Sequence, residues 1–331
     1  MGRTFRKIQV KNMFSFIRNW TLPIAMTIGG LLYLLFSQVE FFAPYRHSIH
    51  IFSAFLAPVL VFLQLLVTFC KISFHELLPQ RFHFTLILVQ FFSTLLFSLP
   101  VILYPDLSDT ARYILEGAVI LFICPTATAA AVITGKLGGS AAALTTYTLF
   151  SNLLAALVVP ILFPLLNPSV DTTFLQACRP ILYKTILLLI LPFFVAVFLR
   201  RYLPRISTFL ATIPDLAFYL WAICLTCVIG MACHASYTSA ASLSSQIAIA
   251  VTALVVCAIL FPLGKFIGSH YHQRISCGQA LGQKNTTLAL WLAYTYLSPI
   301  AALGPGAYII WQNIVNSFQL YLKRKNRLKT D

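Results

Sequence analysis

Apolar segments of membrane-spanning length follow one another along nearly the whole of this chain, with only short polar links between them. A helix needs about 20 predominantly apolar residues to cross the hydrocarbon core of a bilayer. Hydrophobic residues make up 59% of the 331 positions and charged residues only 9%, which excludes an ordinary soluble domain. We predict an all-α membrane protein with ten transmembrane helices, at approximately 20–38, 48–70, 82–104, 112–136, 140–166, 180–199, 207–232, 244–267, 276–297 and 300–322.

The basic residues orient these predicted helices, because Lys and Arg are enriched in cytoplasmic loops. With a cytoplasmic N-terminus, only Arg46, Arg112, Arg179 and Lys184 lie on the outer side. The inner side then holds 18 basic residues: Arg3, Arg6, Lys7, Lys11, Arg18, Lys71, Arg81, Lys136, Arg200, Arg201, Arg205, Lys265, Arg274, Lys323, Arg324, Lys325, Arg327 and Lys329.

This bias predicts a plasma or inner membrane location with both termini cytoplasmic, and no cleaved signal peptide after the basic start. Residues 1–19 would form a cytoplasmic segment and residues 323–331 a basic cytoplasmic tail. We interpret the net charge of +15 as a topology signal and a contact for anionic lipids, not as a nucleic-acid surface.

The two halves of the chain resemble each other. Residues 123–157 and 282–318 each contain a polar cluster inside an apolar run, then a link with glycine, then a second run with an asparagine, Asn152 or Asn313. With five spans in each half, equivalent helices cross the membrane in opposite directions. The pattern predicts inverted repeats at 20–167 and 178–322, and broken helices at matching positions of such repeats indicate the midplane binding site of a secondary transporter.

Polar residues at the two interruptions suit an anion. Pro125 removes a backbone donor from the fourth span, and residues 283–287 form an unbroken polar run in the ninth. The N-termini of half-helices carry free N–H groups and partial positive charge. A small organic anion bearing a carboxylate is therefore the substrate that we expect.

Lys284 is the one basic residue that this topology does not place at the end of a span. An ionisable group in the membrane interior is costly and usually functional. It could serve as counter-ion to a substrate carboxylate or as a proton-coupling group. Alternatively, its ammonium could bond Gln90 and loose carbonyls, and hold the crossing of the broken helices rigid.

The sequence resembles the bile acid:sodium symporter family, on motifs in the fourth and ninth spans. The family's Cys-Pro-Gly-Gly-Thr-Ala-Ser-Asn corresponds to residues 124–131, and its Glu-Val-Gly-Met-Gln-Asn-Ser-Gly corresponds to residues 280–287. This resemblance implies a four-helix panel (spans 1, 2, 6 and 7), a six-helix core, crossing broken helices 4 and 9, and alternating access. From the polar clusters together with these motifs we predict Thr126, Thr128, Lys284, Asn285, Thr286 and Asn313 as substrate-binding residues, although Asn313 could instead form an interhelical hydrogen bond. We predict Gln90, Thr148, Gln283 and Lys284 as cation-site or coupling residues.

The departures from the family concern its sodium ligands. Ala130 and Ala131 replace a Ser-Asn pair, Leu144 replaces a serine, and Ala280 replaces the acid shared by both sodium sites. A sodium ion beside the Lys284 ammonium would be repelled. We therefore predict sodium-independent transport, with this ammonium in the place of the second sodium and no metal or other cofactor.

Two other classes of function stay open. A sodium-coupled bile acid symporter-type carrier would keep the fold, and a passive channel would also tolerate polar residues in the bundle. An intramembrane enzyme is disfavoured, because no metal motif, acid pair or Ser/His arrangement is present. Glu116 lies nine residues before Pro125, roughly 14 Å along a helix, and we interpret it as a carboxylate hydrated at the outer end.

Overall fold

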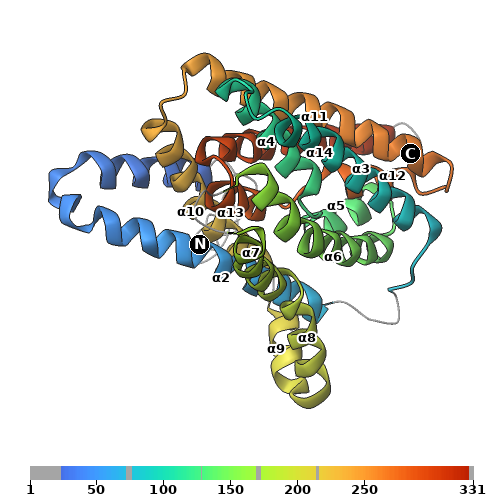
Figure 1. The fold of residues 1–331 in the computed structure, drawn as a ribbon. Helices are drawn as coiled ribbons and strands as arrows, with labels where there is room; N and C mark the ends of the chain where they lie inside the picture. Colours follow the sequence, from blue (N-terminus) through green and yellow to red (C-terminus); the bar gives the residue numbers. More distant parts are fainter. Residues whose placement is uncertain (1–23, 72–76, 128, 169–172, 214–215, 328–331) are drawn as a thin grey trace.

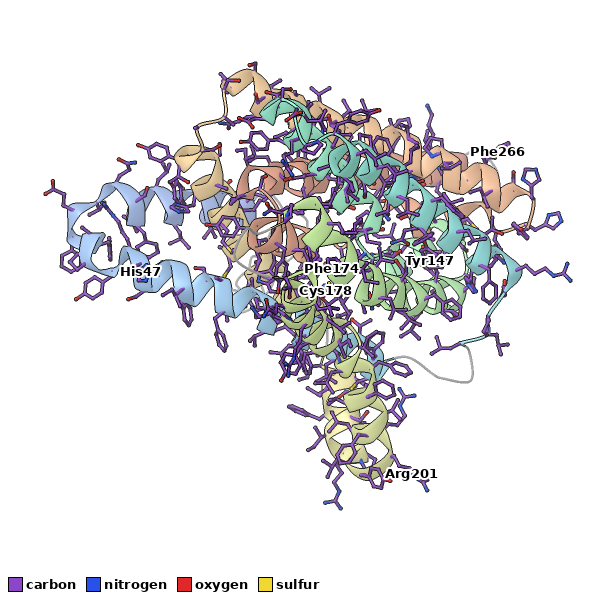
Figure 2. All side chains as sticks on the ribbon, in the orientation of Figure 1. His47, Tyr147, Phe174, Cys178, Arg201 and Phe266 are labelled. Carbon is purple, nitrogen blue, oxygen red and sulfur yellow. The ribbon has the colours of Figure 1, made fainter. Side chains whose placement is uncertain are left out.

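The computed structural model describes residues 24–71, 77–127, 129–168, 173–213 and 216–327, and all regular elements in these ranges are helices. The predicted segment 1–19, Thr128, and residues 169–172 and 328–331 lie outside the described residues. Apolar residues such as Phe266, which Figure 2 labels at the outside of the bundle, are exposed, as lipid-facing positions are.

Six helical segments in the described ranges are long and apolar enough to cross a membrane, and a seventh is added if one bent pair counts as a span. The six are Ile51–Lys71 within α2 (Arg46–Lys71), α3 (Arg81–Leu103), α6 (Ala141–Leu166), Phe174–Tyr202, α10 (Leu216–Thr238) and α11 (Leu243–Ser269). The segment Phe174–Tyr202 comprises α7 (Phe174–Leu189) and α8 (Leu191–Tyr202), and α9 (Pro204–Thr212) follows.

The bent pair lies where we predict the first span. Helix α1 (Ile24–Gln38) meets Glu40–Ile49 at 98°, a stretch that contains η1 (Glu40–Tyr45) and the start of α2. The prediction of ten continuous spans is therefore only partly met by the helices that the structure describes.

The fourth and ninth predicted spans are each divided into two short helices. The fourth consists of α4 (Asp109–Ile123) and α5 (Ala130–Leu137), and the ninth of α12 (Arg274–Gly282) and α13 (Thr286–Tyr296). After η3 (Pro299–Ala302), the tenth is α14 (Leu303–Arg327). Four amides, at Gln312, Asn313, Asn316 and Gln319, lower the hydropathy of α14, which is not among the six apolar helices.

The helices pack in two groups. One group comprises α3, α4, α5, α6, α11, α12 and α14, the other comprises α2, α7, α8, α9 and α10, and α7 of the second group also packs against α6 of the first. Figure 1 shows the first group gathered around α14, and α8 and α9 extending away from it. Helix α13 contacts both groups, since it packs on α2 and α10 as well as on α4 and α14.

Glycines allow α11 and α12 to approach closely. Gly264 and Gly268 are four residues apart on one face of α11, the small-residue spacing that brings membrane helices together. A Cβ at Gly264 would overlap the Cys277 carbonyl oxygen and lie 2.9 Å from the Gly278 Cα. This contact fixes the position of α12, whose far end forms the second helix break.

We therefore expect Gly264→Ala to lower the free energy of unfolding by roughly 1–3 kcal/mol, the usual cost of overpacking. Thermal unfolding of the purified protein in detergent measures this loss. Gly30→Ala is the control, because no atom lies within 4 Å of the position where its Cβ would be built. Equal melting temperatures for the two variants would contradict the close contact between α11 and α12.

Candidate functional site

The two helix breaks lie against each other. Thr126 and Lys284 form an antiparallel bridge. The Ala127 N–H donates to the Gln283 carbonyl at 2.9 Å, and the Asn285 N–H donates to the Pro125 carbonyl at 2.8 Å. Each break therefore supplies backbone partners for the other, which satisfies polar groups that have no water to bond in a membrane interior.

Pro125 explains why α4 ends where it does. Proline disfavours helical backbone in the residue before it, and Cys124 is extended with φ −57° and ψ 133°. Proline also has no N–H to donate to the carbonyl four residues earlier. The last carbonyls of α4 thus need partners from outside their own helix.

Lys284 supplies two of these partners. Its Nζ donates to the Phe122 carbonyl at 3.2 Å and to the Cys124 carbonyl at 3.1 Å, and the side chain is 1% exposed. The carbonyl end of a helix carries partial negative charge, so an ammonium there is electrostatically favoured. Among the described residues, the salt bridge found is Arg112–Glu116, and Lys284 has no carboxylate partner.

Gln90 of α3 bonds the same helix end. Its Nε2 donates to the Ile123 carbonyl at 2.9 Å and to the Cys124 carbonyl at 3.3 Å. Its Oε1 accepts from the Tyr147 hydroxyl at 2.8 Å and the Ser151 hydroxyl at 3.0 Å, both on α6. The Cys124 carbonyl therefore has two donors, Lys284 and Gln90, and α3 and α6 hold one of them in place.

The end of α12 is bonded in a corresponding way. The Thr126 hydroxyl donates to the Ala280 carbonyl at 2.7 Å, and the Tyr308 hydroxyl of α14 donates to the Gly282 carbonyl at 2.7 Å. Asn285 caps the start of α13, where its Oδ1 accepts from the Leu288 N–H at 3.3 Å. The backbone carbonyls at both breaks thus accept hydrogen bonds from the opposite break and from side chains of α3 and α14.

The predicted site residues separate into two sets. Gln90, Thr126, Gln283, Lys284 and Asn285 meet at the crossing, and Thr286 follows it with its N–H on the Lys284 carbonyl. The structure does not bring the other two described residues to the crossing through hydrogen bonds: the Thr148 hydroxyl bonds the Leu144 carbonyl and the Asn313 amide bonds the Ile309 carbonyl, each one turn back in its own helix. Thr128 lies outside the described residues.

Sequence reasoning missed three contributors to this site. The Gln312 Oε1 accepts from the Lys284 N–H at 2.9 Å, while Tyr147 and Tyr308 donate as described above. Gln312 could have been found, because it precedes Asn313 in the amide pair of the second repeat. Neither tyrosine stands out in the sequence, because Tyr147 lies among threonines and Tyr308 precedes two isoleucines.

The interpretation of Glu116 as a hydrated carboxylate is wrong. Glu116 is 1% exposed, and its Oε1 accepts from the Arg112 Nε at 3.2 Å. Its Oε2 accepts from the Ser298 N–H at 3.0 Å, just after α13, while the Arg112 Nη2 donates to the Leu166 carbonyl at the end of α6. The pair links α4 to two other elements, and this explains why the carboxylate is buried.

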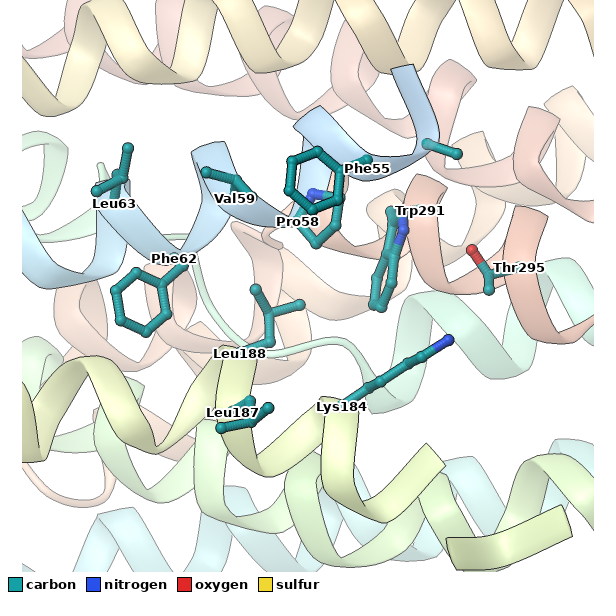
Figure 3. A pocket seen from close by; sticks show the side chains of 11 residues that line it. Phe55, Pro58, Val59, Phe62, Leu63, Lys184, Leu187, Leu188, Trp291 and Thr295 are labelled. Carbon is teal, nitrogen blue, oxygen red and sulfur yellow. The ribbon is translucent and has the colours of Figure 1, made fainter. Parts of the chain in front are cut away.

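A cavity of about 600 Å³ lies between α2, α7 and α13 (Figure 3). Its walls are apolar apart from Lys184 and Thr295, and they include Phe55, Phe62 and Trp291. Figure 3 shows Lys184 reaching toward Thr295 beneath Trp291. One cation among aromatic and aliphatic walls suits a ligand with an apolar body and an acidic group.

The structure thus defines a multi-pass helical membrane protein in which two interrupted helices pair at a buried lysine. The chain belongs to the SBF-like CPA transporter family (DUF4137), which it matches over residues 44–304. Family membership makes it a transporter protein of the membrane, in agreement with the predicted non-enzymatic class. A search of curated proteins gives no significant match.

Removal of the Lys284 ammonium should destabilise the protein. In Lys284→Met the buried Phe122 carbonyl loses its donor, which typically costs about 1–3 kcal/mol. We expect a lower melting temperature in detergent for Lys284→Met, and little change for Lys184→Met, whose ammonium lies 6.0 Å from the Tyr296 ring centroid without a carbonyl partner. A fully stable Lys284→Met would show that the ammonium does not hold the crossing.

Proposed function

We propose that this protein is a secondary active transporter of an organic anion that works by alternating access without sodium. The observation that carries the proposal is the Lys284 ammonium on the carbonyl end of α4, where the two helix breaks pair. In transporters with paired broken helices, carbonyl ends of this kind coordinate the coupling cation. Here a covalently attached cation takes that role.

The charges and carbonyl groups at the crossing favour an ammonium over sodium. Sodium prefers several oxygen ligands and here would sit beside a fixed positive charge, with like-charge repulsion of several kcal/mol at low effective dielectric. The position equivalent to the family's shared acid is Ala280, whose carbonyl already accepts from Thr126. No side-chain carboxylate among the described residues bonds Lys284 to offset a second cation.

The inverted repeat is the architecture that this packing supports. Helices α4 and α12 end at the two breaks, α5 and α13 begin after them, and the breaks pair in antiparallel fashion. The group around α14 corresponds to the core, and α2 with α7 to α10 corresponds to the panel, that the resemblance implies. Since α13 contacts both groups and begins at the crossing, a movement of one group against the other would change the contacts at the crossing.

The residues that line the cavity beside Lys184 indicate which kind of anion would bind. Trp291 and Thr295 are four residues apart on α13, on the face that also carries Thr287 at the start of this helix. An acidic group could pair with Lys184 while the apolar body packs on Phe55 and Trp291. A cavity of about 600 Å³ accommodates a bile-acid-like anion or a smaller carboxylate. Thr126, Thr128, Asn285, Thr286 and Asn313 remain the proposed polar contacts when the crossing opens.

The basic end of the bundle supports the proposed cytoplasmic termini. Lys323 of α14 lies against Gly138, the left-handed C-cap of α5, and Lys136 is in the last turn of α5. Arg274 begins α12 in the same group of helices. These cations would contact anionic lipid headgroups at the cytoplasmic surface.

Counterflow in proteoliposomes tests the carrier proposal. Unlabelled anion trapped inside should drive transient accumulation of labelled anion, at the same rate in sodium and in potassium buffer. The screen should include a bile acid and several short carboxylates, and Lys184→Gln should weaken the apparent affinity at least severalfold. Conductance without counterflow would indicate a channel, and a requirement for sodium would indicate a symporter.

A double variant that removes the ammonium and restores the family's acid tests the role of Lys284 directly. In Lys284→Gln/Ala280→Glu, the ammonium is removed and an acid is placed on α12 where the family carries one. We expect sodium, but not potassium, to raise the melting temperature of this double variant and not that of the wild type, because a ligand stabilises only the state that binds it. Sodium-dependent stabilisation of the wild type would overturn the proposed substitution of ammonium for sodium.

A further inference from the structure

Helix α14 carries a polar stripe that the proposed transport site does not use. Gln312, Asn316, Gln319 and Lys323 follow one another at intervals of four, three and four residues, which places them on one face. The opposite face is apolar and exposed, with Ile314 at 53%, Phe318 at 59% and Tyr321 at 58%. A transmembrane helix with amides along one buried face must satisfy them within the bundle.

The stripe faces α12. The Gln279 Nε2 donates to the Asn316 Oδ1 at 3.0 Å and to the Gln319 Oε1 at 3.5 Å. At one end of the stripe, Gln312 accepts from the Lys284 N–H at the crossing. At the other end, the Lys323 Nζ lies 2.7 Å from the place where a Cβ on Gly138 would be built, at the basic end of α5. The stripe therefore extends from the crossing to the basic end, roughly 16 Å along the helix.

Three of these amides, at Gln279, Asn316 and Gln319, have a buried atom without a partner among the described residues, and so does Gln283 at the crossing. The unpartnered acceptors are the Oε1 atoms of Gln279 and Gln283, and the unpartnered donors are the Asn316 Nδ2 and the Gln319 Nε2. Gln279 is 1% exposed, Asn316 4% and Gln283 6%. A buried amide group left without a bond costs about 1–3 kcal/mol, so four such atoms in one place are expensive in a dry bundle.

Their chemistry identifies the ligand. A cation site would present oxygens alone, and an anion site would present donors alone, whereas the unpartnered atoms here include both acceptors and donors, with the Asn285 Nδ2 at the crossing as a further donor. Water is the small molecule that donates and accepts equally, and a buried water typically makes about three bonds to groups of this kind. The apolar cavity beside Lys184 is lined by residues of α2, α7 and α13, and none of these belongs to the stripe.

We propose that the amide stripe between α12 and α14 binds a chain of water molecules that connects the basic end of the bundle with the crossing at Lys284. This aqueous passage is separate from the cavity in which the organic anion would bind. It hydrates the helix break from the basic side. The water chain is thus a distinct binding site inside the proposed core.

Hydroxyl-radical footprinting tests this proposal, because radicals generated by X-ray radiolysis of water oxidise side chains that contact water. The two probes are Asn316→Cys, on the stripe, and Phe318→Cys, on the opposite face about 3 Å along the axis. Each variant is reconstituted in nanodiscs, and oxidation at the introduced cysteine is read by peptide mass spectrometry. Lys325→Cys, an exposed position, reports radical delivery.

We expect oxidation at position 316 to be at least about tenfold faster than at 318, since thiol oxidation follows exposure. Adding Gln319→Leu to Asn316→Cys should remove this difference by interrupting the passage, and its melting temperature shows whether the variant is folded. Equal, slow oxidation at 316 and 318 in folded protein, with rapid oxidation at 325, would overturn the proposed water chain. Oxidation at 316 that Gln319→Leu leaves unchanged would also overturn it.

Discussion

The need to satisfy backbone groups inside a membrane is the constraint on which this structure depends. Proline at position 125 stops a helix in the middle of the bundle and exposes several carbonyls where no bulk water is available. The carbonyls at this break accept hydrogen bonds from Lys284 of the opposite break, from Gln90 of α3 and from the Asn285 N–H. The second break is satisfied by the same means, through Thr126, Ala127 and Tyr308.

A lysine differs from a bound ion in one physical respect that matters for a transporter. A free cation leaves when its site opens, whereas the Lys284 ammonium stays attached to the break that it stabilises. Under the proposed function, this cation does not leave the protein when the site opens, and the crossing needs no free ion to close.

The two proposed compartments differ in chemistry. The cavity between α2, α7 and α13 is apolar with one cation, which matches an amphipathic anion. The stripe between α12 and α14 is built from amides, which match water. Helix α13 lines the apolar cavity and begins at the helix break where the amide stripe ends. It also contacts both packing groups. A shift of α13 would therefore affect both compartments together.

The helical class, the long apolar spans and the two interruptions follow from the sequence alone, because spanning length, proline and polar runs act through local chemistry. The unusual position of Lys284 was also evident, since a charge inside an apolar run has no local explanation. The hydrogen-bond partners of these residues could not be predicted from the sequence. Gln312, Tyr147 and Tyr308 reach the crossing, Thr148 and Asn313 bond within their own helices, and Glu116 is buried by Arg112. Only the tertiary structure decides these contacts, because the direction of a side chain depends on how helices distant in sequence pack against each other.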